Sequence, residues 1–578
     1  MSTSNSNSKT IHMKRKLNHI LTGIFLITAI TSCGDFGDTN IDPEHLNEGN
    51  VPYNMVFTNA QHQALGSDWD IWRTGVIYAS QWNQHIAAGG WYWNYGLNSY
   101  SGSYSSAYWD ALYSGTRGAV RDITTVMDIW KDQEGMEQNY QISRIMRVYI
   151  MHRMTDLYGD VPYSEAGRPQ TYSYPKYDNQ RDIYLDMLNE LDDAQANLGN
   201  GTAPLGKQDL FFEGNVEGWK KFANSLMLRL GMRLSKVEPQ TAQTWVAKAV
   251  ANGPIVNIED NCFLLHAGGS VNDDSSAPYA KVFVQSDPGI AFINKTFYDI
   301  LAEGNDPRIP LIMCVVNDYP TAAFTNGNYN YGNSDPAIQK GLPGCYSMGP
   351  TSDYFIGLYY PEFANNEELF NEDSEQFYKR HYSQPNRYTY GDPEGVTFLA
   401  TAAQTHLLMA EAAYRGWIGG SAENYYNAGI QAAMLQFSQF PNGRKLYNEY
   451  MTEDAINQYL TDNPFDAPNA LKQINTQYWI TCFCDEYETF SNWRRSGYPE
   501  LVYPNLYLNP VPGVNHNLSR RFTYPDTESQ INTANYEAAV SNLSQGNTFE
   551  SRVWWDINQE TTKKAVIIPP FLILHLPS

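Results

Sequence analysis

Residues 91–109 read WYWNYGLNSYSGSYSSAYW and hold the side chains with the clearest chemistry in this chain. The rings stand among Gly, Ser and Asn, and Leu97 is the only sizeable aliphatic residue. A core segment would add aliphatic neighbours. A ligand with an apolar C–H face and a hydroxyl rim, such as a sugar, needs exposed rings with polar groups beside them. The small residues between the rings keep the ring faces accessible.

We predict that Trp91, Trp93 and Tyr95 lie on an exposed, ligand-facing loop, with Tyr329 and Tyr331 as partners across the site. Tyr and Trp have few rotatable bonds, so holding them ready for a ligand costs little entropy. The alternative is that these rings lock the loop onto a core. Four later residues are spaced for the start of a helix and are predicted to pack inward: Tyr104, Tyr108, Trp109 and Leu112.

No strong catalytic signature appears in the sequence, which lacks His-Glu-x-x-His, Gly-x-Ser-x-Gly and a phosphate-binding loop. The carboxylates of Asp192 and Asp193 fall on the solvent side of a predicted helix, where we expect them to be solvated. Residues 272–276 (NDDSS) offer oxygens to calcium but lack the spacing of the known twelve-residue loop. We expect no catalytic residues, no metal and no cofactor.

The N-terminal residues predict export and a lipid anchor. Lys14, Arg15 and Lys16 precede the apolar residues 20–30, a run too short to span a bilayer and typical of a signal peptide. The run ends in Ile-Thr-Ser-Cys, which resembles a bacterial lipobox, so Cys33 is the predicted lipidation site. The alternative is an ordinary signal with a chance Cys. Met13 directly precedes the basic run and is an alternative start.

The five remaining cysteines are sparse and odd in number, which does not indicate a disulfide framework. We expect structural thiols at Cys262, Cys314, Cys345, Cys482 and Cys484. One disulfide pair is expected among the first three of these, Cys262, Cys314 and Cys345. The net charge of −23 would repel a phosphate backbone and excludes nucleic acid as a partner. Aromatic residues reach 14% of the chain, which suits wet contact surfaces.

Apolar stripes at the helical period run through residues 181–198 and 219–234. Residues 396–417 and 422–437 predict two more helices around a Gly-containing turn, with Ser421 as the cap of the second. Ala402, Ala403, Ala410 and Ala413 would let the pair approach closely. This unit spans about 42 residues, somewhat above the roughly 34-residue tetratricopeptide period.

The patterns divide the chain into six stretches. These are a signal peptide (1–32), a lipidated tether (33–50), a helical scaffold with the aromatic loop 88–110 (51–254), an irregular, loop-rich ligand-side region (255–395), helical repeats with C-terminal loops (396–556) and an atypical tail (557–578). The tail contains AVIIPPFLIL, which is too short and too interrupted by proline for a membrane span.

Six motifs occur in one order along the chain: CGDFGDTNIDP (33–43), DLYGDVPYSEA (156–166), WKKFANSL (219–226), LMAEAAYRGW (408–417), NWRRSGYP (492–499) and RRFTYP (520–525). Together they resemble the SusD/RagB family of nutrient-binding outer-membrane lipoproteins, over about residues 33–556. Physically, residues 159–162 predict a helix-ending turn, because Pro162 disfavours helix at Val161. Arg494 and Arg495 are expected to bind carboxylates or carbonyls in the interior.

The resemblance implies a mainly α fold of about four tetratricopeptide-like helix pairs beside an irregular subdomain with short strands. It also implies a SusC-like TonB-dependent transporter as partner and a role as a lid that captures a ligand. It gives no residue-level match for the ligand site. We expect an oligosaccharide ligand; a peptide ligand, a surface hydrolase and an adhesive surface protein are the alternatives.

Overall fold

Several helices begin at side chains that satisfy the free N–H groups of a first helical turn. In the computed structural model, Asn179 accepts from Arg181 N at the start of α8 (Gln180–Asn197). Ser421 accepts from Asn424 N at the start of α18 (Ala422–Leu435), as predicted. Thr401 and Gln404 form a capping box at the start of α17 (Ala402–Tyr414). Local sequence therefore fixes where these helices start.

The structure describes residues 51–88, 100–113, 117–269, 274–286, 289, 291–316, 330–342, 382–501 and 519–557. Residues 54–578 form one compact unit. Its first helices are α2 (Tyr53–Ala64), α3 (Asp68–Asp70), the π-helix η2 (Ile71–Ser80), α4 (Gly102–Ser105), α5 (Ala107–Tyr113), α6 (Ala119–Trp130), α7 (Glu137–Tyr158), α8, α9 (Val216–Arg233) and α10 (Pro239–Ala251).

Later helices are α11 (Pro278–Lys281), the π-helix η6 (Val282–Ser286), α12 (Lys295–Glu303), α13 (Ile309–Ile312), α17, α18, α19 (Arg444–Tyr450), α20 (Glu453–Asp462), α21 (Ala470–Thr481), α22 (Glu486–Ser496), α23 (Glu528–Ile531) and α24 (Thr533–Ser541). Short 3-10 turns are η4 (Gly206–Gln208), η5 (Ile258–Asp260), η7 (Pro336–Ile338), η8 (Gln436–Gln439) and η9 (Ala467–Asn469). The prediction of a mainly α chain is confirmed.

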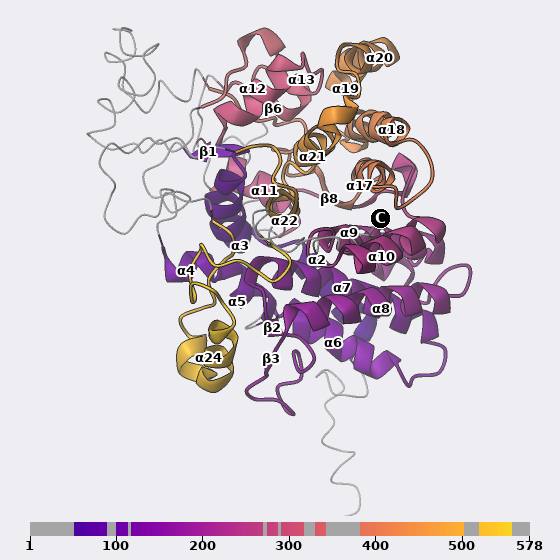
Figure 1. The fold of residues 1–578 in the computed structure, drawn as a ribbon, viewed down its shortest axis with the longest axis vertical. Coiled ribbons are helices and arrows are strands. Elements are labelled where there is room, and N and C mark those ends of the chain that lie inside the picture. Colours follow the sequence, from indigo (N-terminus) through magenta and orange to yellow (C-terminus); the bar gives the residue numbers. More distant parts are fainter. Residues whose placement is uncertain are drawn as a thin grey trace, which may run out of the picture. The chain divides into compact units, whose positions relative to one another are not determined.

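Helices that follow one another in sequence pack as neighbours, which is the tetratricopeptide-like arrangement that was predicted. Figure 1 shows α7, α8, α9 and α10 side by side, with α17 and α18 beyond α9. Small residues allow the close approach of α17 and α18. A Cβ on Gly429 of α18 would lie 2.7 Å from Cγ of Leu407.

The described strands are short and form four antiparallel pairs. They join β1 (Ile86–Ala88) to β5 (Ala291–Ile293), β2 (Val161–Pro162) to β3 (Tyr177–Asp178), β4 (Cys262–Leu265) to β8 (Val396–Ala400), and β6 (Met313–Cys314) to β7 (Gln384–Pro385). The registers include Ile86 opposite Ile293 and Leu265 opposite Val396. These pairs fasten the irregular segments to the helical layer.

The start of the predicted helix 396–417 is wrong. Its first five residues, VTFLA, form strand β8, and the helix begins only at Ala402. Val, Thr and Phe favour a pleated strand when a partner is present. Here β4 supplies that partner, since Phe263 lies opposite Phe398.

Asp192 and Asp193 lie on the solvent side of α8, as expected, with side chains 26% and 59% exposed. They also form surface ion pairs, with Lys248 at 2.5 Å and Arg144 at 2.6 Å. Cys262 and Cys314 are both free thiols and do not pair with each other. The third candidate, Cys345, lies outside the described residues.

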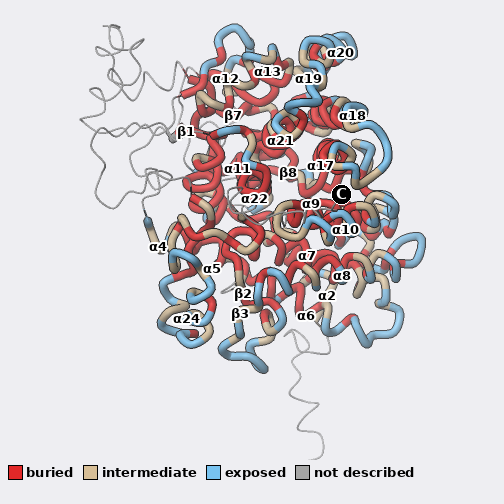
Figure 2. The backbone as a smooth tube through the Cα atoms, viewed as in Figure 1, coloured by how far each residue is buried: buried red, intermediate tan, exposed pale blue. Residues whose placement is uncertain are grey.

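The apolar stripes predicted over residues 181–198 and 219–234 are confirmed, because most of the apolar positions of α8 and α9 are buried. The predicted helix-ending turn is also present: α7 ends before Gly159, whose φ of 88° suits glycine. Figure 2 shows that α7, α9 and α22 are buried along most of their length, whereas α24 is largely exposed. Within the described ranges, no helix is long and apolar enough to cross a membrane.

A buried ion pair joins α22 to α17. Arg495 Nη1 and Nη2 donate to the two carboxylate oxygens of Glu411, each at 2.8 Å, and both side chains are 1% exposed. Burial alone would raise the pKa of Glu411, but the Arg495 and Arg415 guanidinium groups outweigh it and hold that pKa well below its usual range. The pair is a fixed charge contact between two layers of helices.

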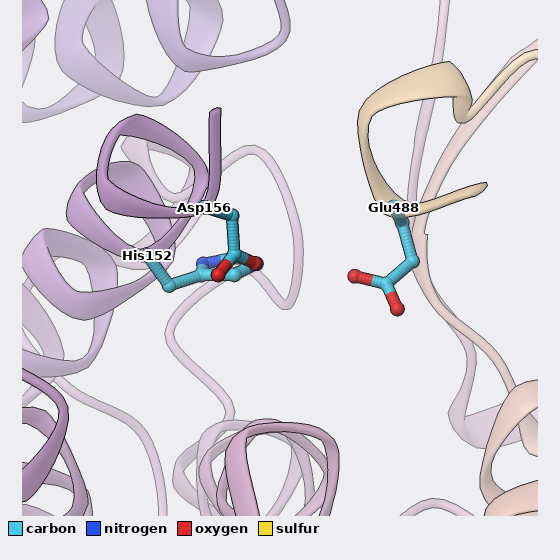
Figure 3. A group of neighbouring side chains, drawn as sticks. All are labelled: His152, Asp156 and Glu488. Atoms are coloured by element: carbon cyan, nitrogen blue, oxygen red, sulfur yellow. The ribbon is translucent and has the colours of Figure 1, made fainter. Parts of the chain in front are cut away.

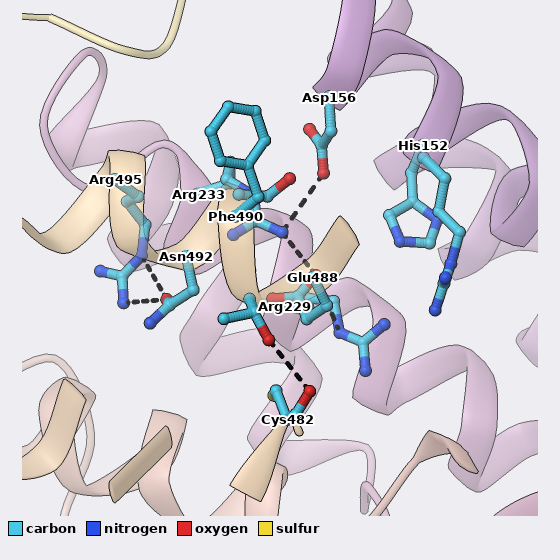
Figure 4. Close-up of polar contacts among 12 residues, drawn as sticks. His152, Asp156, Arg229, Arg233, Cys482, Glu488, Phe490, Asn492 and Arg495 are labelled. Carbon is cyan, nitrogen blue, oxygen red and sulfur yellow. Dashed lines mark hydrogen bonds and ion pairs between the residues drawn. The ribbon is translucent and has the colours of Figure 1, made fainter. Parts of the chain in front are cut away.

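A second buried cluster joins α7, α9 and α22. Figure 3 shows His152 and Asp156 on one helix, facing Glu488 on another. Arg233 Nη2 donates to Asp156 Oδ2 at 3.2 Å and to Glu488 Oε2 at 2.7 Å. Figure 4 shows these contacts around Arg233. One guanidinium therefore neutralises carboxylates from two different helices.

Arg494 adds contacts to two backbone oxygens beside this buried cluster. Its Nη1 donates to Arg520 O at 2.8 Å, and its Nη2 donates to Asp156 O at 2.6 Å. The carbonyl of Asp156 belongs to the last turn of α7, where helical carbonyls lack partners. The prediction that Arg494 and Arg495 bind carbonyls or carboxylates in the interior is confirmed.

We expect Arg495→Ala to lower the free energy of unfolding by about 3–5 kcal/mol, because it leaves the Glu411 carboxylate buried without its bidentate partner. Arg415→Ala is the matched control. Arg415 binds the same carboxylate but is 25% exposed, so its loss should cost below about 1 kcal/mol. Denaturant unfolding at pH 7 measures both, and equal losses would contradict the assignment.

The contribution of the Glu411 ion pair to the free energy of unfolding is complete above the unfolded pKa of Glu411, about 4.3, and is lost as the pH falls toward its folded pKa.

Two buried histidines predict a loss of stability in mild acid. Burial, together with nearby arginines, lowers the pKa of His152 well below its usual range, and burial lowers the pKa of His266 to about 4. The unfolded chain takes up these protons near pH 6.5, so each histidine should cost up to about 1.4 kcal/mol of unfolding free energy per pH unit below that value. We expect His152→Gln to show a shallower decline than wild type between pH 6.5 and pH 5. Identical pH slopes would show that His152 does not contribute.

Candidate functional site

The structure describes only part of the predicted ligand site. Five predicted residues lie outside the described ranges: Trp91, Trp93, Tyr95, Tyr329 and the lipidation candidate Cys33. Their roles stay predictions. The structure places Tyr331, at the start of the described segment 330–342.

Tyr331 stacks face to face on Tyr388, with ring centroids 4.1 Å apart and an interplanar angle of 11°. Both residues are half-buried. Arg387 Nη1 donates to Asn330 O at 2.7 Å, which fixes the backbone on which Tyr331 stands. We call these two rings the Tyr331 pair. Sequence reasoning missed Tyr388, although it belongs to an aromatic run, RYTY, at residues 387–390.

Acidic and amide groups lie near the Tyr331 pair. Burial raises the pKa of the Tyr331 phenol, and the negative charges of Asp392 and Glu394 add to the shift. Burial also raises the pKa of Asp392 to about 6. Asn442 Nδ2 donates to Asp392 Oδ2 at 3.0 Å. A protonated phenol both donates and accepts hydrogen bonds, so the pair combines a stacking surface with groups that suit hydroxyls.

A second group of rings lies where α3 runs into η2 and where α4 contacts η2. Figure 1 labels α3 and α4 near each other. Trp69 and Trp72 have centroids 6.3 Å apart, and Trp72 and Tyr104 have centroids 5.8 Å apart. Arg73 lies among them, with its Cζ 2.8 Å from the Trp69 ring centroid. We call these four residues the Trp69 cluster. Trp69 is 55% exposed, which is high for so large a ring.

The Trp69 cluster corrects one expectation. Tyr108, Trp109 and Leu112 are buried as predicted, at 1%, 3% and 1% exposure. Tyr104 does not join them in the core. It is half-buried on α4, with the Arg73 guanidinium 4.9 Å from its ring centroid. The sequence signal for the cluster was WDIWR at residues 69–73, whose ring spacing also fits an ordinary core helix.

The described residues contain one buried group with ligand types for a metal: His152, Asp156 and Glu488, whose ligand atoms lie within 4.8 Å of one another (Figure 3). Arg233 donates to both carboxylates and already supplies their counter-charge. Arg229 Nε also lies 3.8 Å from Glu488 Oε2. A metal ion would have to displace buried guanidinium groups, so this arrangement fits an ionic lattice better than a metal centre.

Asp274, from the segment considered for calcium, is likewise engaged by cations. Lys281 Nζ donates to its Oδ1 at 3.1 Å, and Arg117 Nη2 lies 3.8 Å from its Oδ2. Each oxygen of this carboxylate therefore already has a positively charged neighbour, where a calcium ion would need a free oxygen ligand. Asn272 and Asp273 lie outside the described residues.

Comparison with protein families gives one match, to a SusD-like family model described as "Starch-binding associating with outer membrane", over residues 51–525. No curated protein sequence matches the chain. Among solved structures, a "chitin-binding protein" is 28% identical with a TM-score of 0.69, and the match covers 88% of this chain and 100% of that one.

Two further structures have the same fold. A Bacteroidetes protein titled "AC2a SusD-like" is 26% identical with a TM-score of 0.72, covering 88% of this chain and 100% of that one. A chitin-binding SusD homologue from Flavobacterium johnsoniae is 22% identical with a TM-score of 0.62, covering 87% and 98%. At that identity the last match shows the fold alone. The family model matches residues 51–525, which is most of this chain, and the sequence motifs occur in the family's order. The chain therefore belongs to the SusD-like family of outer-membrane-associated proteins.

Proposed function

We propose that this protein is a lipid-anchored, cell-surface glycan-binding subunit. It captures an oligosaccharide and delivers it to a SusC-like TonB-dependent transporter in the outer membrane. Catalysis is left to separate enzymes. The transporter partner rests on family membership alone.

The observation that carries the glycan ligand is the similarity to the chitin-binding protein, because the match extends over that protein's whole length at 28% identity. The Tyr331 pair supports the same ligand class. Its stacked rings offer a flat surface to the C–H face of a sugar, and the nearby carboxylate and amide groups suit hydroxyls. The predicted loop rings Trp91, Trp93 and Tyr95 would add further stacking surface.

Affinity measurement with N-acetylglucosamine oligomers, a wider glycan library and a peptide library tests this function. We expect Tyr331→Ala and Trp93→Ala each to weaken glycan binding several-fold, since one stack contributes about 0.5–1.5 kcal/mol beyond area burial. The melting temperature of Trp93→Ala should stay near that of wild type, whereas Tyr331→Ala also loses the stack on Tyr388 and should melt slightly lower. Tyr414→Ala is the control, because Tyr414 is 44% exposed on α17, which is not part of the predicted site.

The alternatives give different results. Binding of peptides without glycans would transfer the role to a peptide ligand. Cleavage of either library would establish a hydrolase. If Trp93 were instead packed in a core, its truncation would cost about 3–5 kcal/mol of stability. A large fall in melting temperature would then replace the selective loss of binding.

We expect Cys33→Ala to release the protein from the membrane fraction and to abolish acyl labelling, because the thiol is the predicted attachment point of the lipid. Mild detergent extraction of native membranes should recover wild-type protein with a transporter-sized barrel. Retention of Cys33→Ala in the membrane with undiminished acyl labelling would refute the anchor. Repeated recovery of wild type as a free monomer would count against the partner.

A further inference from the structure

The Trp69 cluster holds a buried cation with few hydrogen-bond partners. Arg73 is 6% exposed, and its Cζ lies 2.8 Å from the ring centroid of Trp69, 4.7 Å from that of Trp72 and 4.9 Å from that of Tyr104. Burial lowers the pKa of Arg73 to about 10, so the guanidinium is still charged at neutral pH. Three ring faces and the negative charges of Asp68 and Asp70 stabilise this charge, although neither carboxylate binds it directly.

The N–H donors of this guanidinium are poorly used. A guanidinium carries five donors. Arg73 Nη1 donates to Trp69 O at 3.4 Å, which is long for a hydrogen bond, and Nε is buried without an acceptor. A buried charged donor that lacks a partner is costly and calls for an explanation.

The nearest carboxylates on the same helix contact other groups. Asp68 Oδ1 lies 3.7 Å from Lys281 Nζ. Asp70 Oδ1 accepts from Ser67 N at 2.9 Å and lies 3.8 Å from Arg117 Nη1. Neither carboxylate is within ion-pair distance of Arg73 among the contacts of the described residues.

Other buried arginines in the described residues have closer hydrogen-bond partners than Arg73. Arg308 reaches Asp306 at 2.5 Å, Arg233 reaches Glu488 at 2.7 Å, and Arg495 binds Glu411 in bidentate fashion at 2.8 Å. Arg494, which binds no carboxylate, donates to two backbone carbonyls at 2.8 Å and 2.6 Å. Each of these four guanidinium groups therefore makes at least one short hydrogen bond, whereas the bond from Arg73 to Trp69 O is 3.4 Å long. Arg73 instead stands beside a Trp ring that is 55% exposed.

We propose that the Trp69 cluster is a subsite for an anionic sugar residue, with the pyranose ring packed against the exposed part of Trp69 and its carboxylate accepting from the Arg73 guanidinium. This inference rests on the proposed glycan-binding function and gives the ligand class of one subsite. A hexuronic acid carries both required features on one ring. Carboxylates fit the planar donor fork of Arg, and hydrogen bonds to a charged group are roughly twice as strong as neutral ones.

A pair of ligands that differ only in charge tests the proposal. The probes are an oligogalacturonate and the same oligomer with its carboxyls methyl-esterified, titrated against the full mature protein by calorimetry or Trp fluorescence. Wild type should bind the acid at least about tenfold more tightly than the ester, which corresponds to about 1.4 kcal/mol. In Arg73→Gln the acid should lose this advantage while the ester binds as before. Arg73→Lys should keep part of it, since Lys retains the charge without the fork.

Trp69→Phe separates stacking from charge. It keeps an aromatic ring beside Arg73 but reduces the stacking surface, so it should weaken the acid and the ester by similar factors, and it provides a test if Arg73→Gln fails to fold. Equal binding of acid and ester by wild type, or an unchanged preference in Arg73→Gln, would overturn the proposal. N-acetylglucosamine oligomers form the third arm. If they bind and both galacturonate oligomers do not, the anionic subsite is wrong and the glycan-binding function stands. If no glycan of the library binds, the proposed function fails as well.

Discussion

The structure depends on how its buried guanidinium groups are neutralised. Arg495 and Arg233 each bind carboxylates from other helices, and Arg494 binds carbonyls at the end of α7 and on the segment that follows α22. Removing a charge from water is expensive unless the partner geometry is good, so α7, α9, α17 and α22 are constrained to positions that satisfy these contacts together. Such a lattice favours one arrangement of the helices over near alternatives. It explains why Asp156, Glu411, Arg494 and Arg495, all from the family motifs, are buried in the interior.

Periodicity predicted four of the helices, with an error at the start of one. The stripes of α8 and α9 were correct, because one apolar face per helix is what packing in a helical layer requires. Prediction failed at Val396, where the partner strand β4 lies more than a hundred residues earlier in the sequence. A single-sequence pattern does not report such distant pairing, and the apolar run that formed β8 looked like the start of the next helix. The ion pairs of Asp192 and Asp193 were missed for the same reason, since their partners come from other helices.

The candidate site was less predictable than the scaffold. Composition pointed to residues 91–95, because small polar residues among rings are unusual in a core. The same reasoning could not find Tyr388, whose stacking on Tyr331 is a contact between separate segments. It also passed over Trp69 and Trp72, because rings three residues apart on a helix usually mark a buried face. Only the exposure of Trp69 and the position of Arg73 distinguish this cluster from an ordinary core stripe.

The π-helix η2, at Ile71–Ser80, places Trp72 and Arg73 at the beginning of a segment with i→i+5 hydrogen bonding. A π-helix contains more residues per turn than an α-helix. The rings of Tyr78 and Trp82 pack against Phe522 in the core, so the direction of Trp72 and Arg73 relative to the core depends on the winding of η2. A change from π-helical to α-helical winding over the same ten residues would turn the Trp69 end of the helix about its axis while Tyr78 and Trp82 stayed in place.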